Sequence, residues 1–413
     1  MNVARSSGSA TYRTVLAMRE FRLLWLAEVS SVAGDQLGRI ALSVLVFART
    51  GSAALTGLTY GLTFVPTLLG SMFLAGLADH YRRRTVMIVC DVIRAVLIAA
   101  VVIPGLPLWA LCVLVAVSTT WNGPYKAAQQ ALLPEVLHEP HYMLGMSLRQ
   151  VSIQIAQLSG FALGGAVVAF LSPSGGLLVD AATFMVSAMF LIRVASRPVR
   201  PREGERSLSL RGLWRGVQAI PVDRRLLVVV GIGVLNLFHI VPEGLAAPYA
   251  GQLKLPGWSV ALILASAPLG AAIGAVIFGR LIPARLQAGL LGPVAIAAGL
   301  ALVPLFWPVG LAVSLVLFAV SGGLSGIYTM YSAGQAASLA SAQQRARIAG
   351  VNTAVLHTAN GLGPLLGGVV ATLMGPAWAI AGLGGISVLV AAVFAGVWSS
   401  VRRDARAPLP STP

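Results

Sequence analysis

The sequence predicts an all-α polytopic membrane protein with twelve transmembrane helices in two pseudo-symmetric six-helix halves. Of its 413 residues, 57% are hydrophobic and 10% are charged, and the mean hydropathy is +0.84, which leaves too little polar surface for a water-soluble protein. The apolar residues form long uninterrupted runs, whereas the strands of a transmembrane barrel alternate apolar and polar residues. Because only helices and closed barrels satisfy their backbone hydrogen bonds in hydrocarbon, these runs predict helices.

The spans follow from the lengths of these runs. An apolar helix of about 20 residues crosses the hydrocarbon core of a bilayer. Polar, proline and glycine breaks separate twelve predicted spans: 23–47, 54–77, 86–104, 108–128, 143–171, 176–193, 226–249, 258–279, 286–304, 309–331, 348–373 and 377–400. An even number of spans places both termini on the same side of the membrane.

The longest polar segment divides the spans into two groups of six. The predicted organisation is a cytoplasmic N-terminal segment, an N-terminal half, a basic cytoplasmic linker, a C-terminal half and a cytoplasmic tail, at 1–22, 23–193, 194–225, 226–400 and 401–413. Within the linker, the apolar side chains of residues 208–217 could form one face of a short interfacial helix beside anionic lipid. A solvated linker is the alternative.

The basic residues predict the orientation. Six of the 29 Lys and Arg residues fall in outer loops or within or beside the spans, and the others fall in predicted inner loops and termini. Those six are Arg39, Arg49, Arg94, Lys126, Arg149 and Lys254. Because basic loops stay on the inner side, both termini are expected in the cytoplasm and the protein in the inner (cytoplasmic) membrane. The net charge of +16 is then a consequence of topology, and no nucleic-acid partner is expected.

A short repeated motif supports the division into halves. Residues 160–165 (GFALGG) in the fifth span recur as residues 363–368 (GPLLGG) in the eleventh. Small residues allow helix backbones to approach closely, so the motif predicts helix packing, and generic small-residue packing is the alternative. Its members are Gly160, Gly164, Gly165, Gly363, Pro364, Gly367 and Gly368.

Ionisable residues within the first span are the main functional candidates, because charge inside a membrane is costly. Glu28 and Asp35 lie seven positions apart on one helix face, and Arg39 follows Asp35 by one turn. Asp35 lies roughly 18 Å into the span at 1.5 Å per residue, near the midplane. Such a carboxylate can exchange a proton or an ion pair between two conformations. A static Asp35–Arg39 pair is the alternative.

The seventh span carries a second polar group. His239 and Glu243 lie at positions i and i+4, and Asn236 precedes them. A histidine and a carboxylate on one face could relay protons or bind a cationic substrate. A histidine that only packs through a hydrogen bond is the alternative.

Other intramembrane polar residues receive weaker predictions. Asp91 and Arg94, at i and i+3, predict a structural pair in the third span. Asp180 is interpreted as an anion near a helix N-terminus. Candidates to line a cavity are Gln154, Gln157, His357 and Asn360.

Residues 77–84 (LADHYRRR) form a short charged turn between the second and third spans. This turn resembles the G-x-L-A-D-R-x-G-R-R signature of the major facilitator superfamily, with Asp79, Arg83 and Arg84 at matching positions. The resemblance implies parallel halves with a substrate site near the midplane, a gating role for the turn and an antiporter role for the glycine motif. One departure is His80, which replaces a basic residue.

Further segments resemble the branch that contains siderophore, macrolide and multidrug exporters. They are residues 21–25 (FRLLW), 34–35 (GD), 123–124 (GP), 133–134 (LP) and 180–184 (DAATF). This resemblance implies proton-coupled efflux of small amphiphilic molecules by alternating access. An importer or lipid flippase of the same fold is the alternative, and a non-transporting scaffold or sensor is a more remote one.

No motif of a soluble enzyme is present. The sequence contains no G-x-x-x-x-G-K-[ST] phosphate cradle, and its two cysteines, Cys90 and Cys112, lie inside apolar runs. We therefore expect no enzymatic activity, cofactor or metal. The expected partners are a small-molecule substrate, protons as the coupling ion and membrane lipid, and the protein is expected to be a monomer.

Overall fold

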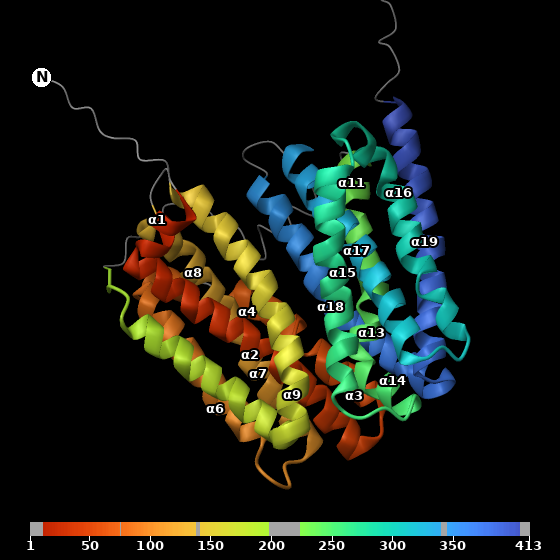
Figure 1. Ribbon diagram of the computed structural model, residues 1–413. Coiled ribbons are helices and arrows are strands. Elements are labelled where there is room, and N and C mark those ends of the chain that lie inside the picture. The colour runs from red at the N-terminus through yellow and green to blue at the C-terminus, as the bar shows by residue number, and fades with distance from the viewer. Residues whose placement is uncertain (1–10, 75, 138–140, 198–223, 340–344, 405–413) are drawn as a thin grey trace, which may run out of the picture.

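The computed structural model describes residues 11–74, 76–137, 141–197, 224–339 and 345–404, and these residues form helices and connecting turns without a strand. Helices α1, α2 and α4 to α9 gather on one side of the molecule and α11 to α19 on the other, while α3 lies against the second group (Figure 1). The first described helix and the last residues of α19 lie at the same end of the molecule. Residues 208–217, for which an interfacial helix is considered, lie outside the described residues.

The helices begin and end as follows. The first group contains α1 (Tyr12–Ala17), α2 (Arg19–Thr50), α3 (Ala53–Gly61), α4 (Val65–Phe73), α5 (Leu77–His80), α6 (Arg83–Val101), α7 (Leu108–Thr120), α8 (Asn122–Val136) and α9 (His141–Ile192). The second group contains α11 (Arg224–Gly231), η1 (Ile232–Leu235), α12 (Asn236–His239), α13 (Val241–Gly244), α14 (Ala246–Gln252), α15 (Ser259–Leu281), α16 (Ala284–Leu300), η2 (Val303–Phe306), α17 (Leu311–Leu339), α18 (Arg345–Met374) and α19 (Pro376–Asp404).

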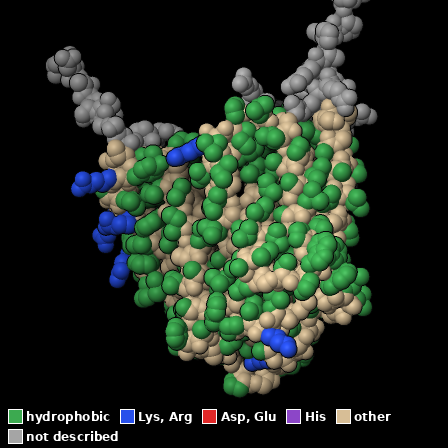
Figure 2. All heavy atoms as spheres, turned by 45° about the vertical axis from the view of Figure 1, so that its right-hand side comes forward, with side chains coloured by type: hydrophobic (Ala, Val, Ile, Leu, Met, Phe, Trp, Pro, Cys, Tyr) green, Lys and Arg blue, Asp and Glu red, His purple; other side chains and the backbone are tan. Residues whose placement is uncertain are grey.

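The predicted class, an all-α polytopic membrane protein, is confirmed. Within the described residues, nine helical segments are long and apolar enough to cross a membrane. Hydrophobic side chains cover the flank of the molecule in Figure 2, as expected for a surface in contact with lipid. The predicted spans at 86–104 and 108–128 correspond to α6, α7 and α8, which are not among those nine. The count of twelve therefore stays a prediction.

The longest helix, α9, is broken in its middle. Ser172 has φ 67° and ψ 165°, which no helix contains, and Pro173 follows it. The chain turns back there, so that the two arms of α9 lie at an angle (Figure 1). This break falls between the predicted spans 143–171 and 176–193, because Ser-Pro-Ser-Gly-Gly offers a proline and two glycines where the helix must stop.

The predicted seventh span is not one continuous helix. It consists of α11, η1, α12, α13 and α14 in succession, with a 3-10 turn at Ile232–Leu235. Pro242 at the start of α13 cannot donate a backbone hydrogen bond to the preceding turn. Irregular backbone of this kind is tolerated at membrane depth where it is buried in protein or lines a cavity.

The two groups of helices meet at the end of the molecule opposite the described termini. Here α3 packs on α18. The part of α9 shortly before the break at Ser172 packs on α15. A Cβ atom at Gly57 or Gly61 of α3 would overlap the carbonyl oxygen of Pro364 or Gly361 on α18. The two backbones are therefore in direct contact. The boundary between halves that was drawn from sequence stays a prediction.

Candidate functional site

Two adjoining cavities lie between the two groups of helices. The first has a volume of about 440 Å³ and the second a volume of about 380 Å³. They share Gln36, Arg39, Phe64 and Gln157 in their walls. The first cavity lies between α2 and α9 on one side and α12, α13, α15, α17 and α18 on the other, while the second is lined mainly by the first group.

The structure brings the candidates of the first and seventh spans to these cavities. Arg39, Asn236, His239 and Glu243 line the first cavity, and Glu28, Asp35 and Arg39 line the second. The weaker candidates Gln154, Gln157, His357 and Asn360 also line one or the other. Residues predicted from separate spans thus share one space, while their roles in coupling or binding stay predictions.

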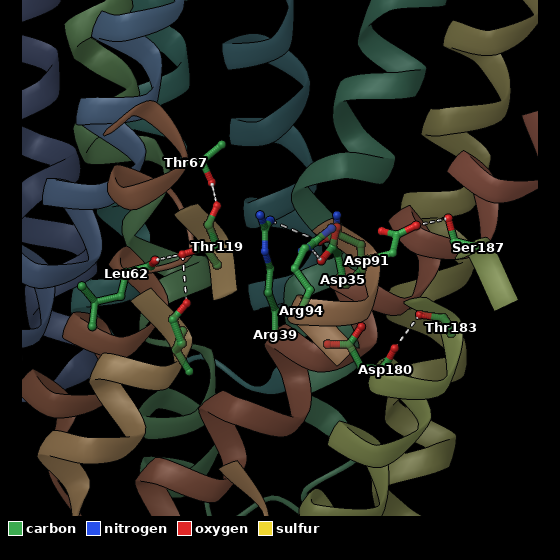
Figure 3. Close-up of polar contacts among 12 residues, drawn as sticks. Asp35, Arg39, Leu62, Thr67, Asp91, Arg94, Thr119, Asp180, Thr183 and Ser187 are labelled. Atoms are coloured by element: carbon green, nitrogen blue, oxygen red, sulfur yellow. Dashed lines mark hydrogen bonds and ion pairs between the residues drawn. The ribbon is translucent and has the colours of Figure 1, made fainter. Parts of the chain in front are cut away.

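The ion-pair partner of Asp35 differs from the one considered from sequence. Arg94 Nη2 on α6 donates a 2.6 Å hydrogen bond to Asp35 Oδ1, so the Asp35–Arg39 pair is wrong. Spacing along one helix suggested Arg39, but α6 packs beside α2 and presents Arg94 to the same carboxylate. Asp91, expected to pair with Arg94, instead accepts a 2.6 Å hydrogen bond from Ser187 Oγ. Figure 3 shows this arrangement.

Arg39 points into the shared wall of the cavities. Its Nη1 donates a 3.2 Å hydrogen bond to Gln36 Oε1, and its guanidinium carbon lies 4.4 Å from the centre of the Phe64 ring. It forms no ion pair within the described part of the chain. A guanidinium stacked on an aromatic ring and open to a cavity can bind an anionic or aromatic group.

Glu28 is held by a residue that the sequence did not single out. Arg149 on α9 donates 2.5 Å and 2.6 Å hydrogen bonds from Nε and Nη2 to the two oxygens of Glu28, and Nη2 also lies 3.2 Å from Gln129 Oε1 on α8. Such a two-pronged contact is among the strongest hydrogen bonds between side chains. Glu28 and Arg149 are far apart in sequence, so no local spacing could have predicted it.

The second group of helices presents Glu243 across the interface. Tyr60 Oη on α3 donates a 2.7 Å hydrogen bond to Glu243 Oε2 on α13. His239 is not paired with Glu243: its Nδ1 lies 2.9 Å from Leu235 O and 2.9 Å from Tyr328 Oη. The predicted His239–Glu243 relay is therefore not formed as a direct contact in this conformation.

Two further polar contacts complete the lining. Asn236 donates a hydrogen bond to Asn360 Oδ1 on α18. Lys126 on α8 is exposed to the second cavity and makes no side-chain hydrogen bond or ion pair within the described residues. From sequence, Lys126 is placed only within or beside a span. Its position after Pro124 does not show in which direction the side chain points.

The charged turn contacts α8 and the end of α9. Arg83 forms an ion pair with Glu135 and donates a 3.0 Å hydrogen bond to Ala131 O, and Arg84 donates a 2.9 Å hydrogen bond to Val194 O. Asp79 is exposed and makes no side-chain hydrogen bond or ion pair in the described ranges. The acidic partner in the ion pair at this turn is thus Glu135, which the sequence analysis did not predict.

The glycine motif lies in tight helix contacts. A Cβ at Gly164 would lie 2.7 Å from Ile40 Cδ1 and 3.1 Å from Leu37 Cα on α2. A Cβ at any other glycine of the motif would also overlap a neighbour: Gly160 with Ala33, Gly165 with Ala261, Gly363 with Leu237, Gly367 with Val241 and Gly368 with Ala53. Pro364 packs on Gly57 and Gly244. These positions accept no larger side chain without a shift of the helices.

Comparison with known proteins agrees with this architecture. The family model described as Major Facilitator Superfamily matches residues 24–357. The multidrug efflux pump Tap of Mycobacterium tuberculosis is 24% identical over 371 residues, which cover 84% of this chain and 85% of Tap. The enterobactin exporter EntS of Salmonella typhimurium is 25% identical over 407 residues, which cover 94% of each chain.

A solved structure shows the same fold. The crystal structure of a bacterial homolog of the human lysosomal transporter Spinster, in an inward-facing and unoccupied conformation, superposes with a TM-score of 0.71 at 14% identity. The alignment covers 95% of this chain and 99% of that chain. The resemblance inferred from the charged turn and the glycine motif is confirmed. The chain belongs to the Major Facilitator Superfamily, a family of membrane transporters rather than enzymes.

Proposed function

We propose that this transporter exports small amphiphilic molecules in exchange for protons, by alternating access of a central site. The observation that carries the proposal is the pair of adjoining cavities between the two groups of helices, lined by charged residues from both. The substrate class is drug-like, macrolide-like or siderophore-like. The protein acts as a monomer, because each chain contains a complete central cavity.

The contacts between the groups support alternating access. They lie at the end of the molecule opposite the described termini, where α3 meets α18 and Tyr60 bonds to Glu243. If both termini are cytoplasmic, as the positive-inside rule predicts, this end faces outward and the conformation is closed to the outside. A second conformation that opens this seam would expose the same cavities to the other side.

The lining supports an amphiphilic substrate. Apolar side chains such as Phe64, Phe161 and Ile240 share the first cavity with amides and charged groups. Binding sites for small molecules combine an apolar wall with a few placed polar groups. A substrate with an apolar body and one polar or charged edge fits such a wall.

The direction of transport is proposed from the relatives. Tap is described as a multidrug efflux pump and EntS as an enterobactin exporter, and each aligns with most of this chain. The division at residues 23–193 and 226–400 is proposed as the pair of rigid halves. Asp35 and Glu28 are proposed as coupling acids, and Arg39, Asn236, His239 and Glu243 as cavity residues.

The test uses purified protein in lipid vesicles. Vesicles are given an interior more acidic than the medium, and uptake of ethidium, erythromycin and a catechol-bearing anion is followed with and without a protonophore. The proposal expects uptake of at least one probe against its gradient in molecules whose cytoplasmic face is outside, and loss of uptake with the protonophore. Uptake that needs the opposite pH gradient would indicate import, and redistribution of a fluorescent lipid alone would indicate a flippase.

A further inference from the structure

Asp180 on α9 is enclosed in the first group of helices. Its side chain is 4% exposed, and its Oδ1 atom has no hydrogen-bond partner. It does not lie in the first turn after the break at Ser172, where the helix dipole would act on it, so the interpretation of Asp180 as a helix-terminus anion is wrong. The question is which group offsets the cost of burying the carboxyl group of Asp180.

Two glycines of α2 make room for this carboxyl group. A Cβ at Gly34 would lie 2.9 Å from Asp180 Oδ1, and a Cβ at Gly38 would overlap Asp180 Oδ2. The carboxyl group therefore lies directly on the backbone of α2, between Asp35 and Arg39 in height. The site is formed by the fold rather than by a flexible side chain at a surface.

The acidic and basic groups around Asp180 are unequally buried. From α6, Arg94 faces it with 2% exposure, and Asp91, with 0% exposure, lies near Arg94. From α2, Asp35 and Arg39 face it. Tyr125 and Lys126 of α8 lie near the same cluster. Arg94 is the guanidinium enclosed with the three carboxyl groups (Figure 3). Arg94 donates its side-chain hydrogen bond to Asp35.

Burial makes three ionised carboxylates around Arg94 unfavourable. An unpaired charge in a protein interior costs several kcal/mol, and Arg39 is already bonded to Gln36 at the cavity wall. Asp35 is paired with Arg94, and Asp91 accepts a hydrogen bond from Ser187. Among the residues that the structure describes, none donates a side-chain hydrogen bond to Asp180, so it is the carboxyl group with least to stabilise a negative charge.

We propose that Asp180 is a proton-binding site, occupied in this conformation and separate from the central cavity. A small cavity of about 50 Å³ is lined by Asp180, Arg94, Asp35 and Arg39. Asp35 and Arg39 also line the 380 Å³ cavity. Asp35 thus stands between the buried carboxyl group and the central space, and its side chain is 27% exposed.

The same geometry gives a route for release. When Arg94 leaves Asp35 for Asp180, the proton of Asp180 passes through water in the small cavity to Asp35, which no longer has Arg94 as its partner. Asp35 then gives the proton to the central cavity. Asp180 ends as a carboxylate paired with Arg94, so charge and protons balance. This coupling step rests on the proposed function, whereas the proton site itself does not.

The site is tested by infrared spectroscopy on the purified protein in lipid nanodiscs. A neutral carboxyl group absorbs at a carbonyl stretching frequency that carboxylates lack. We expect this band in the wild-type protein at neutral pH and its loss in Asp180→Asn, which replaces a neutral acid with a neutral amide of similar shape. Asp79→Asn, at an exposed acid, should leave the band intact, and Asp91→Asn should leave most of it.

Several results would overturn the assignment. The first result needs only the wild-type protein. If its spectrum lacks a neutral aspartate band, checked with carboxyl-labelled aspartate, the proposal is contradicted, even if Asp180→Asn fails to fold. A band that persists in folded Asp180→Asn contradicts it as well. In vesicles, Asp180→Asn should lose accumulation driven by the pH gradient and keep substrate exchange. If the wild type does not accumulate any probe while the band is present, the proposed function fails and the proton site stands.

Discussion

Replacing Tyr60 by phenylalanine should shift the protein away from the conformation described. The change removes the 2.7 Å hydrogen bond from Tyr60 Oη to Glu243 Oε2, which joins α3 to α13 across the interface. A hydrogen bond to a charged group contributes about 1.5–3 kcal/mol. Since every 1.4 kcal/mol is a factor of ten, the ratio of molecules closed at this end to molecules open there should fall roughly ten- to hundredfold.

The shift can be measured as a distance between spin labels. Trp109 and Trp307 are 71% and 65% exposed. Trp109 lies in the first turn of α7 and Trp307 follows η2, so cysteines at these two positions report the opening of the closed end. Cys90 and Cys112 are first replaced by serine. We expect a longer-distance population in Tyr60→Phe that is minor or absent in the parent protein.

A double-mutant cycle provides the control for Tyr60. Glu243→Gln removes the charge of the acceptor, and if the two residues act through one bond, the double variant should shift the population no further than the larger single effect. Additive shifts, or a distance distribution in Tyr60→Phe identical to that of the parent, would refute the view that this bond helps to hold the outer end closed.

Three further substitutions test other parts of the site. Asp35→Asn should abolish accumulation driven by a pH gradient yet allow exchange, and it should lower stability by about 3–5 kcal/mol because Arg94 loses its buried partner; uptake and thermal melting measure both. Gly164→Leu should block transport in vesicles, because the added side chain overlaps Leu37 and Ile40. Arg83→Ala should slow conformational switching in stopped-flow measurements, with substrate binding retained, whereas exposed Asp79→Asn should change switching little.

Each of these substitutions has an outcome that contradicts it. If folded Asp35→Asn still accumulates substrate, the proton is released without Asp35, with Asp180, Glu28 and Glu243 as the next candidates. Normal flux in well-folded Gly164→Leu would make the close contact incidental to transport. If Asp79→Asn slows switching as much as Arg83→Ala, the Arg83–Glu135 pair is not the contact that matters.

The helical runs could be predicted from sequence because the bilayer imposes a local rule. A segment either offers enough apolar length or it does not, and breaks such as Ser172-Pro173 show in the sequence itself. Within the seventh span the rule was too coarse. Pro242 and neighbouring glycines interrupt the helix into α11 to α14, although the run remains apolar throughout.

The partners of buried charges could not be predicted in the same way. Spacing along one helix suggested Arg39 for Asp35, but which face of α2 meets α6 depends on packing between helices far apart in sequence. For the same reason, the sequence did not predict that Arg149 would bind Glu28 or that Tyr60 would bind Glu243. That these acids would face a common cavity was predictable, because a charge at membrane depth has few other places to lie.

The contact of α3 with α18 has a consequence for the rate of opening. Gly57 and Gly61 touch the main chain of Pro364 and Gly361, so at these points the outer seal consists of backbone against backbone. At Gly57 and Gly61 no side chain has to change rotamer for the two backbones to part or to meet again. A contact of this kind closes tightly yet separates with little rearrangement, which suits the alternating access proposed above.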